Sequence, residues 1–136
     1  LYREESVLDR VREITDGAGC SVVYDSVGKE TFTQSLDCLK LRGMLVSFGQ
    51  SSGPVEPIAP VLLSQKGSLF LTRPVLFDYI ATRLELEAAT EALFAVVEAG
   101  KVSVEVQQTF PLSNAAEAHR ALEERRTTGS TVLTVR

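Results

Sequence analysis

The chain has 136 residues, of which 44% are hydrophobic and 24% are charged, and its formal net charge is −4. This length suffices for one domain with a buried core. The composition excludes a disordered chain, and no uncharged apolar run approaches the length of a membrane span. The 14 basic residues form no stripe and are outnumbered by 18 acidic ones, so we expect no nucleic-acid partner.

The cysteine and histidine content argues against a metal centre. Cys20 and Cys38 form no C-x-x-C motif, and His119 has no second ligand at a useful spacing. We therefore predict no metal site. Two thiols without a disulfide pattern favour a reducing compartment, and we predict a cytoplasmic location. No signal peptide is visible, and the chain begins with Leu1 instead of Met, so we expect a fragment or a protein with an upstream partner.

The first fifty residues alternate between helical patterns and short apolar runs. Residues 5–16 place their apolar side chains on one helical face, and Gly17 is expected to stop this helix. Residues 21–24 lack polar alternation, which predicts a strand buried on both faces. A second helix is predicted over 30–41 and a second strand over 44–48. Strands that alternate with helices in this way indicate a parallel sheet with right-handed crossovers.

The remaining residues predict a loop, three strands and two helices. In chain order these are a proline-containing loop over 54–67, a strand over 68–72, a helix over 78–99, a half-exposed strand over 102–106, a helix from Ser113 or Asn114 to Arg125 or Arg126, and a strand over 131–135. Gly100 is expected to follow the long helix in the left-handed conformation that ends many helices.

Small and polar residues follow both strands of the first half. Residues 25–28 end the first strand region and residues 49–53 follow the second. In open α/β sheets, ligands bind outside the carboxyl ends of the strands. The two segments are therefore expected beside a ligand.

Nine short stretches occur in a characteristic order along essentially the whole chain: Tyr2–Glu5, Val22–Gly28, Ser35–Leu39, Val46–Gly49, Ser51–Gly53, Gln65–Leu69, Thr72–Pro74, Pro111–Leu112 and Thr128–Ser130. Together they resemble the bacterial quinone oxidoreductases of the medium-chain dehydrogenase superfamily. The resemblance implies an enzyme that uses no zinc and transfers hydride from NADPH to a quinone or a related enone or carbonyl compound.

The same resemblance implies an α/β fold. Residues 1–98 would be the C-terminal half of a Rossmann-type parallel sheet with flanking helices, and residues 99–136 a tail that returns to the catalytic domain. It also implies a homodimer that pairs the edge strand Ser68–Thr72 with its copy. The Gly-rich phosphate loop G-x-G-x-x-G occurs nowhere in this sequence, so the chain alone is expected to be inactive.

Cofactor-binding residues follow from the resemblance position by position. Six are expected at the nicotinamide end of the site: Ser26, Val27, Gly28, Phe48, Gly49 and Ser51. Tyr2 and Arg125 are expected at the adenosine 2′-phosphate, where a guanidinium suits the anion. Arg126 is adjacent to Arg125, and the resemblance does not separate the two. No catalytic side chain is expected, because NADPH carries the chemistry.

A second class of function remains open: a non-catalytic half-Rossmann module that dimerises or binds nucleotide weakly. Phe48 would then be a core residue, and Arg125 a helix C-terminal residue favoured by the helix dipole. The reading frame upstream of Leu1 discriminates the two. A Gly-rich βα turn there indicates the enzyme, whereas a start codon beside Leu1 indicates the module.

Overall fold

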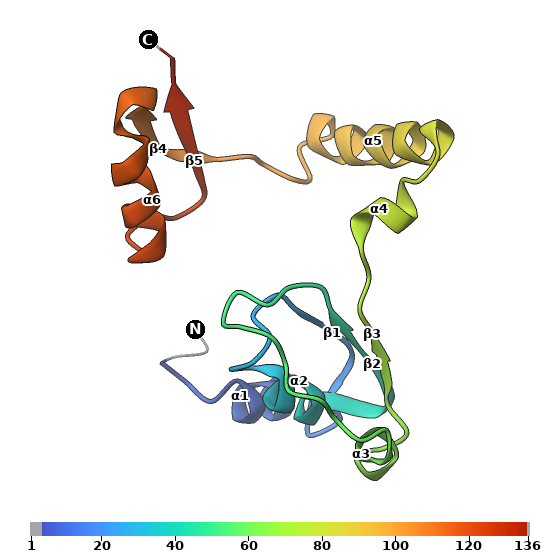
Figure 1. The fold of residues 1–136 in the computed structure, drawn as a ribbon. Helices are drawn as coiled ribbons and strands as arrows, with labels where there is room; N and C mark the ends of the chain where they lie inside the picture. The colour runs from blue at the N-terminus through green and yellow to red at the C-terminus, as the bar shows by residue number, and fades with distance from the viewer. Residues whose placement is uncertain (1–3, 136) are drawn as a thin grey trace. The chain divides into compact units, whose positions relative to one another are not determined.

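The computed structural model describes residues 4–135 (Figure 1). The chain folds into two compact units, Leu1–Tyr79 and Ile80–Arg136. Tyr2, expected at the phosphate, lies outside the described residues. The boundary expected near residue 98 concerns the domains of a whole enzyme, and it stays a prediction.

The first unit is an α/β structure built on a parallel sheet in the order β1-β2-β3, which confirms the predicted fold class. Its elements are α1 (Val7–Ile14), β1 (Cys20–Asp25), α2 (Phe32–Asp37), β2 (Leu39–Ser47), α3 (Val61–Gln65), β3 (Phe70–Thr72) and α4 (Leu76–Tyr79).

The core of this unit lies on one face of the sheet. It consists of Phe32, Leu36, Leu39, Leu45 and Leu69, with side chains of α3 and of the proline-containing loop packed against it. Both crossovers run in the same direction, so right-handed connections place α2 and α3 on that same face. Among the described residues the opposite face is partly open to solvent, since Tyr24 of β1 is 72% exposed and Met44 of β2 is 38% exposed. The prediction that β1 is buried on both faces was therefore wrong.

The second helix is shorter than predicted. It ends at Asp37, and residues 39–41, expected to be helical, already belong to β2. The N–H of Cys20 donates to the carbonyl of Cys38 (2.8 Å), and Cys20 pairs with Leu39 across the sheet. Leu39 is buried in the core from a strand, so its helical spacing from Leu36 misled the prediction.

The second unit contains α5 (Arg83–Glu98), β4 (Val106–Pro111), a short 3-10 turn (Leu112–Asn114), α6 (Ala115–Glu123) and β5 (Ser130–Thr134). β4 and β5 pair in parallel, with α6 in the connection between them. Ala118 and Ala121 are the buried residues of α6. The strand predicted over 102–106 begins only at Val106, where pairing with Ser130 starts.

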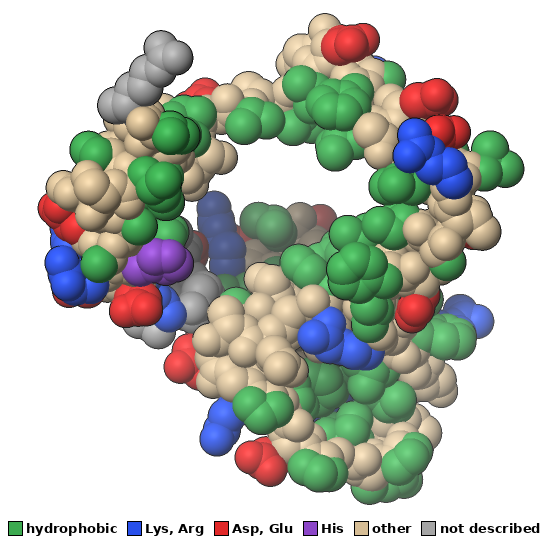
Figure 2. Space-filling view, turned by 45° about the horizontal axis from the view of Figure 1, so that its top comes forward, with side chains coloured by type: hydrophobic (Ala, Val, Ile, Leu, Met, Phe, Trp, Pro, Cys, Tyr) green, Lys and Arg blue, Asp and Glu red, His purple; other side chains and the backbone are tan. Residues whose placement is uncertain are grey.

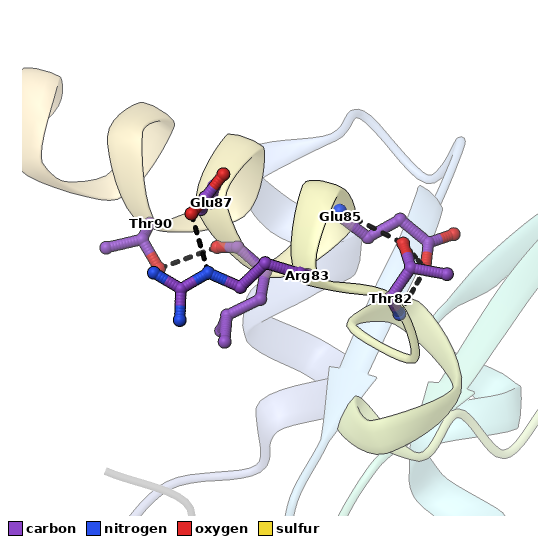
Figure 3. Close-up of polar contacts among 6 residues, drawn as sticks. Thr82, Arg83, Glu85, Glu87 and Thr90 are labelled. Carbon is purple, nitrogen blue, oxygen red and sulfur yellow. Dashed lines mark hydrogen bonds and ion pairs between the residues drawn. The ribbon is translucent and has the colours of Figure 1, made fainter.

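The single helix predicted over 78–99 is divided, because Thr82 starts a new helix (Figure 3). The Thr82 hydroxyl accepts from the N–H of Glu85 (3.2 Å), and the Glu85 carboxylate accepts from the N–H of Thr82 (2.9 Å), a capping box. Arg83 pairs with Glu87 one turn further on (2.6 Å). Gly100 follows the helix with φ +65°, and its N–H donates to Val97, which confirms the predicted helix end.

β3 lies at an edge of the sheet, since among the described strands it pairs with β2 alone. It begins at Phe70, two residues later than predicted. Leu69 is buried in the core, whereas Phe70 is 57% exposed. Across residues 4–135, no helix is both long and apolar enough to cross a membrane.

Candidate functional site

Residues 26–28 follow β1 and form the first turn, and residues 48–53 follow β2 and form the second turn. The two turns are joined by hydrogen bonds at the carboxyl end of the sheet. Asp25 and Ser47 are partners in the parallel pairing, so both strands end at the same level. The N–H of Phe48 donates to the Asp25 carbonyl (2.9 Å), and the N–H of Ser51 donates to the Ser26 carbonyl (3.2 Å). Ser52 donates to the Val27 carbonyl from both its N–H (2.9 Å) and its hydroxyl (2.7 Å). The six residues predicted at the strand ends are therefore brought together.

Glycine is required at position 49 by close packing between the two turns. A Cβ there would lie 2.4 Å from the Ser26 carbonyl oxygen and 2.7 Å from the Ser26 Cα. Gly28 has φ +87°, a conformation that favours glycine, and a Cβ there would lie 2.9 Å from the Gly53 carbonyl oxygen. Both glycines predicted at the site thus serve the contact between the turns.

A buried carboxylate organises the first turn. Asp25 is 4% exposed, and its carboxylate accepts from the N–H groups of Val27 (2.8 Å) and Gly28 (3.0 Å). It also accepts from the hydroxyl of Thr31 (2.8 Å), the N-cap of α2, and from the hydroxyl of Ser35 (2.7 Å) within α2. Burial raises the pKa of this carboxyl, but the four hydrogen bonds lower it more, so the pKa lies below its ordinary value.

From the sequence, Asp25 was expected in a segment beside a ligand, but it was not named among the cofactor-binding residues. An aspartate followed two and three residues later by amides that it can accept from is an Asx-turn pattern, and this local signal was available. The two hydroxyls could not be foreseen, because Ser35 lies ten positions away and reaches Asp25 only once α2 has formed.

The backbone of the first turn is largely occupied by these contacts. The N–H groups of Val27 and Gly28 bind Asp25, and the carbonyls of Ser26 and Val27 accept from the second turn. Within residues 4–135, the hydroxyls of Ser26 and Ser51 make no hydrogen bond. These two hydroxyls are therefore among the polar side-chain groups that the joined turns can offer to a ligand.

An aromatic surface borders the second turn. Phe48 is 50% exposed and lines a hollow with Tyr24, Met44, Thr72 and Tyr79. Hydrophobic side chains are exposed on the first unit (Figure 2). The first turn borders a second hollow, where Ser26 and Val27 meet residues of α1 and α2. The joined turns therefore present hydroxyls beside an apolar ring.

Arg125 lies in the second unit, just beyond α6, and adopts a left-handed backbone with φ +57°. Its N–H donates to Leu122 (3.0 Å) and that of Arg126 donates to Ala121 (2.9 Å), the Schellman arrangement in which this position is usually glycine. The helix therefore ends at Glu123, before the arginines at which it was predicted to end. Arg126 is ion-paired with Glu124 (2.6 Å).

Among residues 4–135, no three His, Cys, Asp or Glu side chains gather in a way that could hold a metal ion.

A family model described as zinc-binding dehydrogenase matches residues 1–133. The quinone oxidoreductase of Pseudomonas aeruginosa is 54% identical over 132 residues, covering 97% of this chain and 41% of that protein. A 2-haloacrylate reductase from Burkholderia is 47% identical, covering 97% of this chain and 40% of its own length. Escherichia coli quinone oxidoreductase complexed with NADPH superposes with a TM-score of 0.90 at 49% identity, covering 98% of this chain and 42% of that structure. The chain thus spans about two fifths of these relatives.

Replacing Gly49 with Ala should lower the free energy of unfolding by about 1–3 kcal/mol, because the added methyl group forces the two turns apart. Gly17→Ala is the control, since a Cβ at Gly17 meets nothing within 4 Å. That control should cost only about 1 kcal/mol, from its left-handed backbone. Urea unfolding measures both, and amide NMR shifts at Ser26 should change in Gly49→Ala alone. A Gly49→Ala chain as stable as the wild type would contradict the packing described.

Proposed function

The chain belongs to the zinc-binding dehydrogenase family, and we propose that it forms the C-terminal part of an oxidoreductase that transfers hydride from NADPH to a quinone or a related enone. The joined turns at the carboxyl ends of β1 and β2 carry this proposal, since ligands of open α/β sheets bind there. Similarity to an NADPH-complexed quinone oxidoreductase along 98% of the chain supports the choice of cofactor. The proposal involves no zinc.

The first turn and Phe48 would hold the nicotinamide end of NADPH. The hydroxyls of Ser26 and Ser51 suit the carboxamide or the ribose, and the exposed ring of Phe48 suits an apolar face. Val27, Gly28 and Gly49 would contribute through the shape of the backbone, because their polar groups hold the turns together. Bound NADPH supplies the hydride, so the chain's own task is to bind and orient.

Arg125 and Tyr2 would bind the 2′-phosphate that distinguishes NADPH from NADH. The left-handed backbone at Arg125 supports this role, because a non-glycine residue in that conformation costs about 1–2 kcal/mol. An arginine at a position where glycine is favoured fits a side chain that is needed for binding. We also propose a cytoplasmic protein, in keeping with the free thiols of Cys20 and Cys38.

The activity is tested in a chain of the relatives' full length. We expect a chimaeric E. coli quinone oxidoreductase, with this chain in place of its matching 42%, to oxidise NADPH with a simple quinone. The isolated 136-residue chain should not, because its sequence holds no Gly-rich phosphate loop. Consumption of NADPH at 340 nm is the measurement. A folded but inactive chimaera would favour the non-catalytic module.

Arg125→Gly should separate structure from binding in the same chimaera. Glycine relieves the left-handed backbone, so thermal stability should rise, by about 1 kcal/mol. Loss of a charged hydrogen bond should raise the KM for NADPH by roughly ten- to a hundredfold and leave that for NADH nearly unchanged. Arg126→Ala is the matched control. Equal losses with both cofactors would make Arg125 structural, and a loss with Arg126→Ala alone would transfer the role to Arg126.

We further propose a homodimer in which β3 pairs with its copy, because β3 is an apolar edge strand. Phe70→Lys should give monomers by sedimentation at tens of micromolar protein, whereas the wild-type chain should be dimeric. Phe94→Lys on α5 is the control, since Phe70 and Phe94 are each 57% exposed. Leu69 is unsuitable for this test, because it is buried in the core. Dimers that persist with Lys at position 70 would count against pairing through β3.

A further inference from the structure

We propose that Asp25 is a positioning residue of the cofactor site: its carboxylate fixes the first turn, and through it the second, so that Ser26 and Phe48 face the nicotinamide. The inference rests on the proposed function. It assigns a role to a residue that is not itself expected to touch the cofactor.

The carboxylate joins the turn to the helix that follows it. Two of its four donors are backbone amides of the turn, at Val27 and Gly28. The other two are the hydroxyls of Thr31, the N-cap of α2, and of Ser35 within α2. An acceptor shared in this way leaves the turn little freedom relative to α2. Asp25 is 4% exposed, so water does not replace these donors readily.

A continuous series of hydrogen bonds leads from this carboxylate to the second turn. Asp25 holds Val27 through its side chain, and the Val27 carbonyl accepts from the N–H and hydroxyl of Ser52. The main-chain carbonyl of Asp25 also accepts from the N–H of Phe48. A change in the first turn is therefore transmitted to Phe48 by direct contacts.

Thr15 offers a matched comparison at the opposite end of β1. Its hydroxyl donates to the Val11 carbonyl (2.6 Å) and accepts from the N–H of Gly19 (3.0 Å), so it too joins a helix end to a backbone turn. Thr15 is half-buried, as Thr31 is. Loss of the Thr15 or the Asp25 side chain should destabilise the fold, but only Asp25 and its four donors adjoin the proposed site.

The test compares Asp25→Ala, Asp25→Asn and Thr15→Val in the chimaeric enzyme, below the melting temperature of each variant. Asp25→Ala should lower kcat/KM for NADPH about tenfold, which corresponds to the loss of one strong hydrogen bond between the displaced turn and the cofactor. The KM for the quinone should stay unchanged. Asp25→Asn should restore kcat/KM to within about threefold, because the amide oxygen still accepts from Val27 and Gly28. Thr15→Val should lower the melting temperature and leave both kinetic constants unchanged.

Equal effects of Asp25→Ala and Thr15→Val on kcat/KM would overturn the inference, because Asp25 would then act through stability alone. Should Asp25→Ala fail to fold, Thr31→Val carries the same test: a fall in kcat/KM for NADPH supports the inference, and a value equal to that of Thr15→Val overturns it. A wild-type chimaera that consumes no NADPH would reject the proposed function itself. An active chimaera that is insensitive to these changes would reject the role of Asp25 alone.

Discussion

An ionised carboxylate that is removed from water must be given hydrogen-bond donors, because a buried charge without partners costs several kcal/mol. Asp25 meets this requirement with two amides and two hydroxyls. Those donors come from the turn after β1 and from α2 with its N-cap, so satisfying one side chain fixes the turn against the helix. The lowered pKa of Asp25 is the electrostatic sign that the charged form is the one that these donors stabilise.

The parallel register then extends this local constraint to the second turn. Because Asp25 pairs with Ser47, Gly49 lies directly against Ser26. A Cβ at position 49 would lie 2.4 Å from the Ser26 carbonyl oxygen, so no side chain fits there. Sheet pairing, a buried carboxylate and one glycine thus create one continuous surface from two segments more than twenty residues apart. Such a surface suits a cofactor that needs to be oriented more than it needs to be activated.

The sequence predicted those features that depend on local patterns. Alternating apolar runs and helical spacings predicted the parallel sheet, and Gly100 predicted the end of α5. The limits of α2 and the exposure of Tyr24 were mistaken, because both depend on which strands pair and which face the crossovers cover. Arg125 shows a further limit of the sequence. A glycine after α6 would have predicted the left-handed backbone that ends the helix, but this position is occupied by an arginine.

We propose that the two joined turns are the nicotinamide end of an NADPH site. A crystal structure of the chimaeric enzyme with NADPH tests it most directly. We expect the nicotinamide to lie against Phe48, with its carboxamide or ribose within hydrogen-bond distance of the Ser26 or Ser51 hydroxyl, and the contacts of Asp25 to be unchanged. A nicotinamide bound away from both turns would contradict it.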